Sequence, residues 1–202
     1  MKTRNLSILL AGLFVIAGAV CAAAARAEGE VPAPPAIGAT IEDFTLPDYD
    51  NRDRSLKSLA GKNGTVLIFV AVQCPVSNAY NERMEKLAQE YQAKGIAVIG
   101  INSNVAEDAA AVKSHASTHN LTFPILKDPG NKIADKFGAS VTPEAYLIDR
   151  NNKLVYHGRI DNARNAAEVQ SADLRNAIEA TLSGKPIEKT EAKAFGCSIK
   201  RS

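Results

Sequence analysis

The stretch "VLIFVAVQCPVSNAY", residues 66–80, changes character at Cys74 and decides the fold. Its first half, residues 66–72, is a continuous apolar, β-branched run of strand length, typical of a strand that is covered on both faces. From Val76 onward the apolar residues recur at helical spacing, and Gly95 supplies a stop. A cysteine therefore lies where a buried strand passes into a helix.

The next segment repeats the strand-then-helix order. Residues 96–102 are predicted to form a second buried strand. Asn104 followed by Glu107 resembles a capping box, which predicts a helix from there to about His119. The apolar residues that this helix is expected to turn inward are Val105, Val112 and Ala116.

Shorter elements complete the pattern. They are a strand at 123–126, a helical segment at 128–138, two strands at 144–149 and 154–160 around a turn, and a last helix capped by Ser171 and ended by Gly184. The alternation predicts an α/β fold in which helices flank a central mixed sheet. Parallel pairing is expected for the alternating part, and the hairpin is expected to form an antiparallel edge.

The first 27 residues have the features of an export signal. Lys2 and Arg4 give a basic start, residues 6–20 an apolar core, and residues 25–27 a small-x-small cleavage site. We expect a periplasmic or secreted protein with no membrane span in its mature form. A lipid anchor at Cys21 is not expected, because the residues before it lack the leucine-then-small pattern of a lipoprotein signal.

Behind this leader the sequence divides into a proline-rich linker at 28–36, one domain at 37–184 and a tail at 185–202. Three of the 24 basic residues lie in the leader, so the remaining chain is nearly neutral against its 22 acidic residues. No Lys/Arg stripe stands out, and we therefore expect neither nucleic acid nor an anionic membrane as a partner.

Cleavage of the leader would remove one of three cysteines and leave Cys74 and Cys197 in a compartment where disulfides persist. Two cysteines allow one internal pairing. That pairing is either a static disulfide that ties the tail to the domain or a thiol pair that cycles between oxidation states.

The position of Cys74 favours a reactive thiolate. A helix N-terminus lowers the pKa of a thiol through unpaired N–H groups and the positive end of the helix dipole. Pro75 suits the first helical position, and Ser77 is placed to donate a hydrogen bond to the thiolate. The alternative interpretation, a buried structural thiol, stays open from this stretch alone.

A second feature is Pro143, which directly precedes the strand at 144–149 and by itself reads as an ordinary edge or turn proline. Together with "DFTLPD" at 43–48, Cys74 after its apolar strand, and "VTPEAYLIDRNNKLVYHG" at 141–158, it gives the chain a resemblance to a known superfamily. Over about residues 37–183 the chain resembles the thioredoxin-like superfamily, in the redoxin (alkyl hydroperoxide reductase and thiol-specific antioxidant) branch.

The resemblance implies a thioredoxin-like fold in which the peptide bond before Pro143 is cis and faces Cys74. It also implies that an extended substrate segment binds along the backbone of Thr142. This branch contains peroxiredoxins and exported thiol-disulfide reductases. The chain is most similar to a peroxiredoxin-like group that keeps only the first thioredoxin cysteine.

Several departures from the family limit the expected chemistry. Ser77 replaces the second cysteine of the reductases, so no disulfide can close within this motif. Peroxiredoxins need a threonine or serine and a proline where this chain has Ala71 and Leu67, and their active-site arginine would fall near Pro143. Their peroxidatic cysteine aligns with Ser77. The peroxidase constellation is therefore missing.

The tail offers the one remaining thiol. Gly196 would allow the backbone to approach another surface closely, and Phe195 and Ile199 would anchor the tail on the domain. If Cys197 reaches Cys74, it resolves a mixed disulfide that Ser77 cannot resolve. A static disulfide or a free tail thiol is the alternative.

The histidines give no metal-binding pattern. His115 and His119 lie one helical turn apart and could together bind a metal, but no cysteine or carboxylate pattern joins them, so a solvated helix face is favoured. His157 is interpreted as structural. A copper-delivery role like that of the exported Sco proteins would need a paired-cysteine motif, which this sequence lacks. We expect no metal and no other cofactor.

These observations predict an exported thiol-disulfide oxidoreductase-like enzyme whose Cys74 thiolate attacks a disulfide or an oxidised thiol of a protein or small molecule. Pro75, Thr142 and Pro143 would shape its docking site, and Cys197 or an external thiol reductant would complete the cycle. A weak thiol peroxidase that consumes peroxide is the first alternative. A non-catalytic thiol- or metal-binding module is the second.

Overall fold

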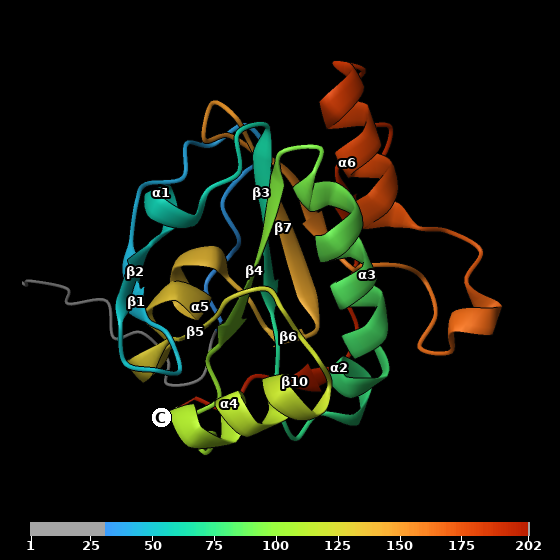
Figure 1. Ribbon diagram of the computed structural model, residues 1–202. Helices are drawn as coiled ribbons and strands as arrows, with labels where there is room; N and C mark the ends of the chain where they lie inside the picture. Colours follow the sequence, from blue (N-terminus) through green and yellow to red (C-terminus); the bar gives the residue numbers. More distant parts are fainter. Residues whose placement is uncertain (1–30, 202) are drawn as a thin grey trace, which may run out of the picture. The chain divides into compact units, whose positions relative to one another are not determined.

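The computed structural model of the protein describes residues 31–201 (Figure 1). The predicted export signal at 1–27, with Cys21, and the beginning of the predicted linker lie outside the described residues. Within residues 31–201, no helix is both long enough and apolar enough to cross a membrane.

A six-stranded mixed sheet forms the centre of the fold, in the order β5-β4-β3-β7-β8-β9. Its strands are β3 (Gly64–Phe69), β4 (Ile96–Asn102), β5 (Ile125–Lys127), β7 (Glu144–Asp149), β8 (Leu154–Gly158) and β9 (Glu191–Ala192). Strand β3 pairs in parallel with β4 and antiparallel with β7, which confirms the predicted mixed sheet. The hairpin β7–β8, however, lies inside the sheet, because the tail adds β9 beside β8 as a parallel edge strand.

Two small antiparallel pairs accompany this sheet. They are β1 (Thr45–Pro47) with β2 (Asp53–Ser55), and β6 (Val141–Thr142) with β10 (Cys197–Ser198). The second pair joins the tail to the segment that leads into β7. Figure 1 shows β10 beside β6 and close to α2.

Helices cover both faces of the sheet (Figure 1). They are α1 (Leu56–Leu59), α2 (Pro75–Ala79), α3 (Asn81–Gln92), α4 (Ala109–Thr118), α5 (Lys132–Phe137) and α6 (Asp173–Ser183), with 3₁₀ turns at Pro129–Asn131 and Ala166–Glu168. Side chains of α3, α4 and α6 pack into the core on one face, and those of α1 and α5 into the core on the other. All six residues of β3 are buried, and the four apolar ones, residues 66–69, alternate between the two cores, as the apolar run predicts.

The predicted start of α4 is wrong. The helix begins at Ala109, and its N-cap is Asp108, whose carboxylate accepts a hydrogen bond from the Ala111 N–H at 2.7 Å. Asn104 and Glu107 precede the helix and do not cap it. As a result Val105 is 61% exposed and not turned inward, whereas Val112 is buried as predicted.

The predicted cap of the last helix is also wrong. The N-cap position of α6 is Ala172, and no side chain caps it. The first turn is satisfied by a distant backbone group instead, because the Leu174 N–H donates to the Ile160 carbonyl at 3.1 Å. Gly184 ends the helix in the left-handed conformation, with φ of 67°, as expected.

Candidate active site at the start of helix α2

Cys74 lies at the junction between β3 and α2, at the N-cap position of the helix. Its backbone is extended, and its sulfur accepts a hydrogen bond from the Ser77 N–H at 3.2 Å. Pro75 occupies the first helical position, where its missing N–H leaves no intrahelical bond unmade. Cys74 is only 2% exposed. The helix therefore aims an N–H group at the sulfur, as the sequence predicts.

Ser77 contributes to the site in a different way from the one predicted. The hydrogen bond to the Cys74 sulfur comes from its backbone N–H, while its hydroxyl oxygen accepts from the Ala71 N–H at 3.2 Å. Ser77 is 1% exposed. The hydroxyl thus holds the loop before Cys74 and does not serve as the donor to the thiolate.

The segment before β7 faces the cysteine from the opposite side. The peptide bond between Thr142 and Pro143 is cis. The carbonyl oxygen of Thr142 accepts a hydrogen bond from the Cys74 thiol at 3.3 Å. The Thr142 hydroxyl is buried without a hydrogen bond of good geometry and lies near the same sulfur. The structure therefore brings Cys74, Thr142 and Pro143 together.

The tail brings Cys197 to the same place. Strand β10 pairs antiparallel with β6, and Cys197 is the residue opposite Thr142. A Cβ atom on the preceding Gly196 would lie 1.9 Å from the Thr142 carbonyl oxygen, so this approach requires glycine. Both cysteines are free thiols, and their side chains lie close enough for each to shift the pKa of the other.

The surroundings of the two thiols shift their pKa values in opposite directions. Burial acts to raise the pKa of Cys74, but the neighbouring Cys197 thiol, the nearby Thr142 hydroxyl and the hydrogen bond from the Ser77 N–H together outweigh it, and the pKa falls below its ordinary value. The pKa of Cys197 is raised, first by the neighbouring Cys74 and then by burial. Of the two thiols, Cys74 is therefore the one that loses its proton at the lower pH.

Aromatic and apolar contacts hold the tail in this position. Phe195 packs edge to face on Tyr80, with ring centroids 6.3 Å apart. Ile199 is 5% exposed and joins the core that α5 covers, and its N–H donates to the Ser140 carbonyl at 3.0 Å. The two anchor residues therefore flank Cys197 on either side.

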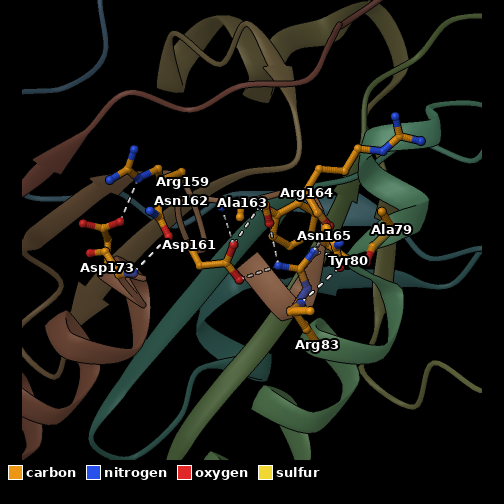
Figure 2. Close-up of polar contacts among 12 residues, drawn as sticks. Ala79, Tyr80, Arg83, Arg159, Asp161, Asn162, Ala163, Arg164, Asn165 and Asp173 are labelled. Atoms are coloured by element: carbon orange, nitrogen blue, oxygen red, sulfur yellow. Dashed lines mark hydrogen bonds and ion pairs between the residues drawn. The ribbon is translucent and has the colours of Figure 1, made fainter. Parts of the chain in front are cut away.

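Tyr80 is itself fixed by a polar network (Figure 2). Its hydroxyl bonds to the Asp161 carboxylate at 2.9 Å, and Arg83 forms an ion pair with the same carboxylate at 2.6 Å. Arg83 also donates to the Ala163 and Arg164 carbonyls, so the loop after β8 is tied to the start of α3. The Arg83 guanidinium lies 3.6 Å from the centre of the Tyr80 ring. The platform under Phe195 is therefore rigid.

Glu107 is a residue of this site that sequence reasoning missed. Its buried carboxylate accepts hydrogen bonds from the N–H groups of Val72 and Gln73, both at 2.9 Å, and so holds the loop that leads to Cys74. Burial acts to raise its pKa, but these hydrogen bonds outweigh the effect and lower it. The Asn104-to-Glu107 spacing was the available signal, and it resembled a helix cap.

The histidines lie apart from this arrangement. The rings of His115 and His119 are 4.4 Å apart, and burial followed by the charge of His119 lowers the pKa of His115. His157 bonds to the buried carboxylate of Glu144 at 2.9 Å. Across residues 31–201, no group of three or more His, Cys, Asp and Glu side chains is arranged to hold a metal ion.

The positions that a peroxidase would use have other roles here. Ala71 is buried and bonds through its N–H to Ser77, and Leu67 is a core residue of β3. The position expected for an arginine holds the cis proline, Pro143. The chemistry that this arrangement supports is therefore thiol-disulfide exchange between neighbouring sulfur atoms.

A mixed sheet between two helical layers, with a thiol at a helix N-terminus facing a cis proline, defines a thioredoxin-like protein of the redoxin branch. The chain belongs to the AhpC/TSA family, whose sequence model matches residues 37–157. Among curated proteins it is similar to the thiol-disulfide oxidoreductase ResA of Geobacillus thermodenitrificans, with 32% identity over 119 residues that cover 59% of this chain and 67% of the relative.

Solved structures agree with this assignment. A hypothetical protein from Sinorhizobium meliloti 1021 has a TM-score of 0.77 and 34% identity, and the match covers 83% of this chain and 96% of that one. A putative thiol:disulfide interchange protein DsbE from Chlorobium tepidum has a TM-score of 0.61 at 23% identity, covering 73% and 98% of the two chains. The second likeness concerns the fold alone.

Proposed function

We propose that the protein is an exported thiol-disulfide oxidoreductase in which Cys74 attacks the substrate and Cys197 resolves the resulting mixed disulfide. It is an oxidoreductase that acts on thiols, a role supported by its family and by the relatives named thiol-disulfide oxidoreductases. The observation that carries the two-cysteine cycle is the pairing of β10 with β6, which sets Cys197 opposite Thr142, the residue whose carbonyl oxygen accepts a hydrogen bond from the Cys74 thiol. The pKa shifts agree with it, because the pKa is lowered at Cys74 and raised at Cys197.

The first step is attack by the Cys74 thiolate on one sulfur of a substrate disulfide. A bond forms between Cys74 and that sulfur, the substrate disulfide breaks, and the second substrate sulfur leaves as a thiolate that takes up a proton. The N–H of Ser77 stabilises the attacking thiolate, because it already points at the sulfur. Thr142 and Pro143 supply the surface against which the substrate docks.

The second step releases the substrate. Cys197 loses its proton and attacks the Cys74 sulfur, so a Cys74–Cys197 disulfide forms and the remaining substrate sulfur leaves as a thiolate. Two electrons have then passed from the protein dithiol to the substrate disulfide. An external dithiol reductant would return the protein to its starting state. Ser77 takes no part in the electron transfer, because a hydroxyl cannot form this bond.

The docked tail limits the access of substrates to Cys74. Strand β10 occupies the backbone edge at Thr142, and Cys74 is 2% exposed beneath it. A substrate that reaches Cys74 as an extended segment must displace β10, and the tail must return before Cys197 can attack. Small thiols and disulfides need a smaller opening. The tail therefore acts both as a competitor for the site and as the source of the second thiol.

The proposal is tested with an aromatic disulfide that releases a coloured thiolate, in a Cys21→Ser background that leaves only the two cysteines of interest. The unsubstituted pair should release two thiolates per chain and end as an internal disulfide. Cys197→Ser should release one and retain the other group on Cys74, and Cys74→Ser should lose the fast phase. A Cys74→Ser protein that keeps the full rate would contradict the proposal. Peroxide consumption by the same variants measures the peroxidase alternative.

The features of the first 27 residues support an extracytoplasmic location for this chemistry. Residues 1–27 have the anatomy of an export signal, and an oxidising compartment is where disulfide substrates occur. Cell fractionation of the tagged full-length chain tests the location. A chain that stays in the cytoplasm at full length would overturn this part of the proposal.

A further inference from the structure

The turn after β4 touches both cysteine-bearing segments. On one side is Glu107, which is 2% exposed and holds the N–H groups of Val72 and Gln73, directly before Cys74. A buried carboxylate needs such partners, because an unpaired charge in the interior is costly. Glu107 also accepts hydrogen bonds from the side-chain amides of Asn102 at 2.6 Å and Asn104 at 3.1 Å.

On the other side Asn104 holds the tail. Its side-chain oxygen accepts a hydrogen bond from the Lys200 N–H at 2.8 Å, while its side-chain nitrogen donates to Glu107. The neighbouring Val105 N–H donates to the Lys200 carbonyl at 3.0 Å. Lys200 follows Cys197 by three residues, so both backbone groups of a residue close to the second thiol are held by this turn.

One asparagine side chain thus connects the two halves of the thiol pair. Its nitrogen reaches the carboxylate that fixes the loop before Cys74, and its oxygen reaches the backbone that follows Cys197. The asparagine is 8% exposed, so water does not easily replace either hydrogen bond. A side chain that only capped a turn would not need the second of these partners, which lies 96 residues away along the chain.

We propose that Asn104, held by Glu107, is a positioning residue that sets how often the Cys197 sulfur lies against Cys74. The inference rests on the proposed two-cysteine cycle. It adds the residue that holds the tail so that Cys197 lies next to Cys74. Asn104 contacts neither the substrate nor a sulfur atom. Asn104 acts on the effective concentration of Cys197 at Cys74. For a thiol on a tethered segment, this concentration rises as the segment is held more firmly in place.

The measurement is the glutathione ratio, taken as the squared thiol concentration over the disulfide concentration, at which half of the protein carries the Cys74–Cys197 disulfide, in the Cys21→Ser background. Oxidation of the pair turns one glutathione disulfide into two glutathione thiols, so this ratio has the units of a concentration and reports the effective concentration of one thiol at the other. Asn104→Ala should lower it on the order of fivefold, the effect of one hydrogen bond. Alkylation of Cys74 in Asn104→Ala with Cys197→Ser should keep the rate of Cys197→Ser alone, because the contacts of Cys74 itself remain.

A second variant removes the same hydrogen bond from the tail. Lys200→Pro lacks the N–H that Asn104 accepts, and the exposed Lys200 side chain makes room for the substitution. It should lower the effective concentration by a similar factor, and the double variant should show little further loss, because both changes delete one interaction. Asn63→Ala is the matched control, since Asn63 makes one side-chain-to-backbone bond, to the Lys94 carbonyl, at the opposite end of β3.

The outcomes separate this inference from the proposed function. If the unsubstituted pair forms no internal disulfide with glutathione, the two-cysteine cycle fails, and the role of Asn104 fails with it. If the disulfide forms but Asn104→Ala and Lys200→Pro change the ratio by less than about twofold, as Asn63→Ala should, the positioning role alone is overturned. The positioning role would also be overturned if the two substitutions lowered the effective concentration independently, so that the double variant lost the product of the two factors.

Discussion

Cys74 and Cys197 both adjoin Thr142, but the segments that carry them are held in different ways. Cys74 follows β3, in which every residue is buried, and it is 2% exposed at the N-terminus of α2. Cys197 is half-buried on β10, a strand of two residues that pairs only with the equally short β6. The nucleophile is built into the central sheet, whereas its partner is held by a docked segment.

This difference separates the two steps of the chemistry. A nucleophile benefits from a fixed N–H group and a constant environment, because its pKa depends on both. A resolving thiol has to leave when substrate binds and return afterwards. Segments with few buried apolar contacts open at lower free-energy cost than core strands do. The docked tail gives Cys197 the freedom to leave and return, and the central sheet gives Cys74 its constant environment.

The largest expected effect comes from the loop before Cys74. Glu107→Ala removes the shared acceptor of the part-buried Val72 and Gln73 hydrogen bonds, which should lower the free energy of unfolding by about 2 kcal/mol. Urea denaturation measures the loss. Glu107→Gln, which keeps one oxygen, should lose clearly less. A loss under about 0.5 kcal/mol in the alanine variant would show that this support of Cys74 is weaker than its contacts indicate.

A second substitution tests the support of Cys197. Gly196→Val places a side chain where even a Cβ would lie 1.9 Å from the Thr142 carbonyl, so β10 should no longer pair with β6. The effective concentration of Cys197 at Cys74 should fall about a hundredfold, toward that of a flexible tether. Ser198→Ala, an exposed neighbour on the same strand, is the control. An unchanged glutathione ratio in Gly196→Val would mean that β10 does not set the contact.

A smaller effect is expected at the aromatic anchor. Phe195→Ala removes the edge-to-face contact with Tyr80, a type of pair that contributes about 0.5–1.5 kcal/mol beyond its buried area. The tail should open more often, and trypsin should cut it after Lys193 on the order of tenfold faster while the core stays intact. If cleavage keeps its original rate, Phe195 does not anchor the tail.

The smallest effect concerns pH. Because the pKa of Cys74 is lowered, its thiolate is present at a lower pH than that of a free cysteine, and alkylation by iodoacetamide should reach half its maximal rate at that lower pH. Cys197→Ser alters one of the hydrogen bonds that lower it, so the half-maximal pH should rise. A midpoint at or above that of a free cysteine in the unsubstituted pair would contradict the assignment of Cys74 as the thiolate.

The same shift links Cys74 to stability. A group whose pKa is lower in the folded state contributes stability above its unfolded pKa, and this contribution is lost as the pH falls through the folded pKa. Reduced protein should therefore gain stability from Cys74 on the alkaline side, and Cys74→Ser should remove that part of the pH dependence. Unfolding curves at several pH values measure it.

The sequence predicts the support of Cys74 much better than that of Cys197. The apolar run, Pro75 and the helical spacing after it act within a few residues, so the strand, the helix and the N-cap cysteine follow from local rules. The resemblance placed Thr142 and Pro143 opposite the thiol, and the structure has them there. These parts need little knowledge of the rest of the fold.

The remaining parts depend on distant contacts. Asn104 and Glu107 have the same spacing whether they cap a helix or bind segments far along the chain, and local pattern cannot distinguish the two. Ser171 is predicted as an N-cap because serine favours that position. No local pattern shows that the Ile160 carbonyl instead accepts the hydrogen bond from the Leu174 N–H. The docking of the tail likewise depends on a surface that exists only in the folded domain.

The central claim is that Cys74 attacks first and Cys197 resolves. It is tested most directly by a time course in which the reduced Cys21→Ser protein meets one equivalent of glutathione disulfide, is quenched in acid and is mapped by mass spectrometry of its peptides. The account predicts glutathione on Cys74 at early times, then its loss as a Cys74–Cys197 disulfide appears within the same chain. Glutathione that first appears on Cys197, or that stays on Cys74 while Cys197 remains a free thiol, would contradict it.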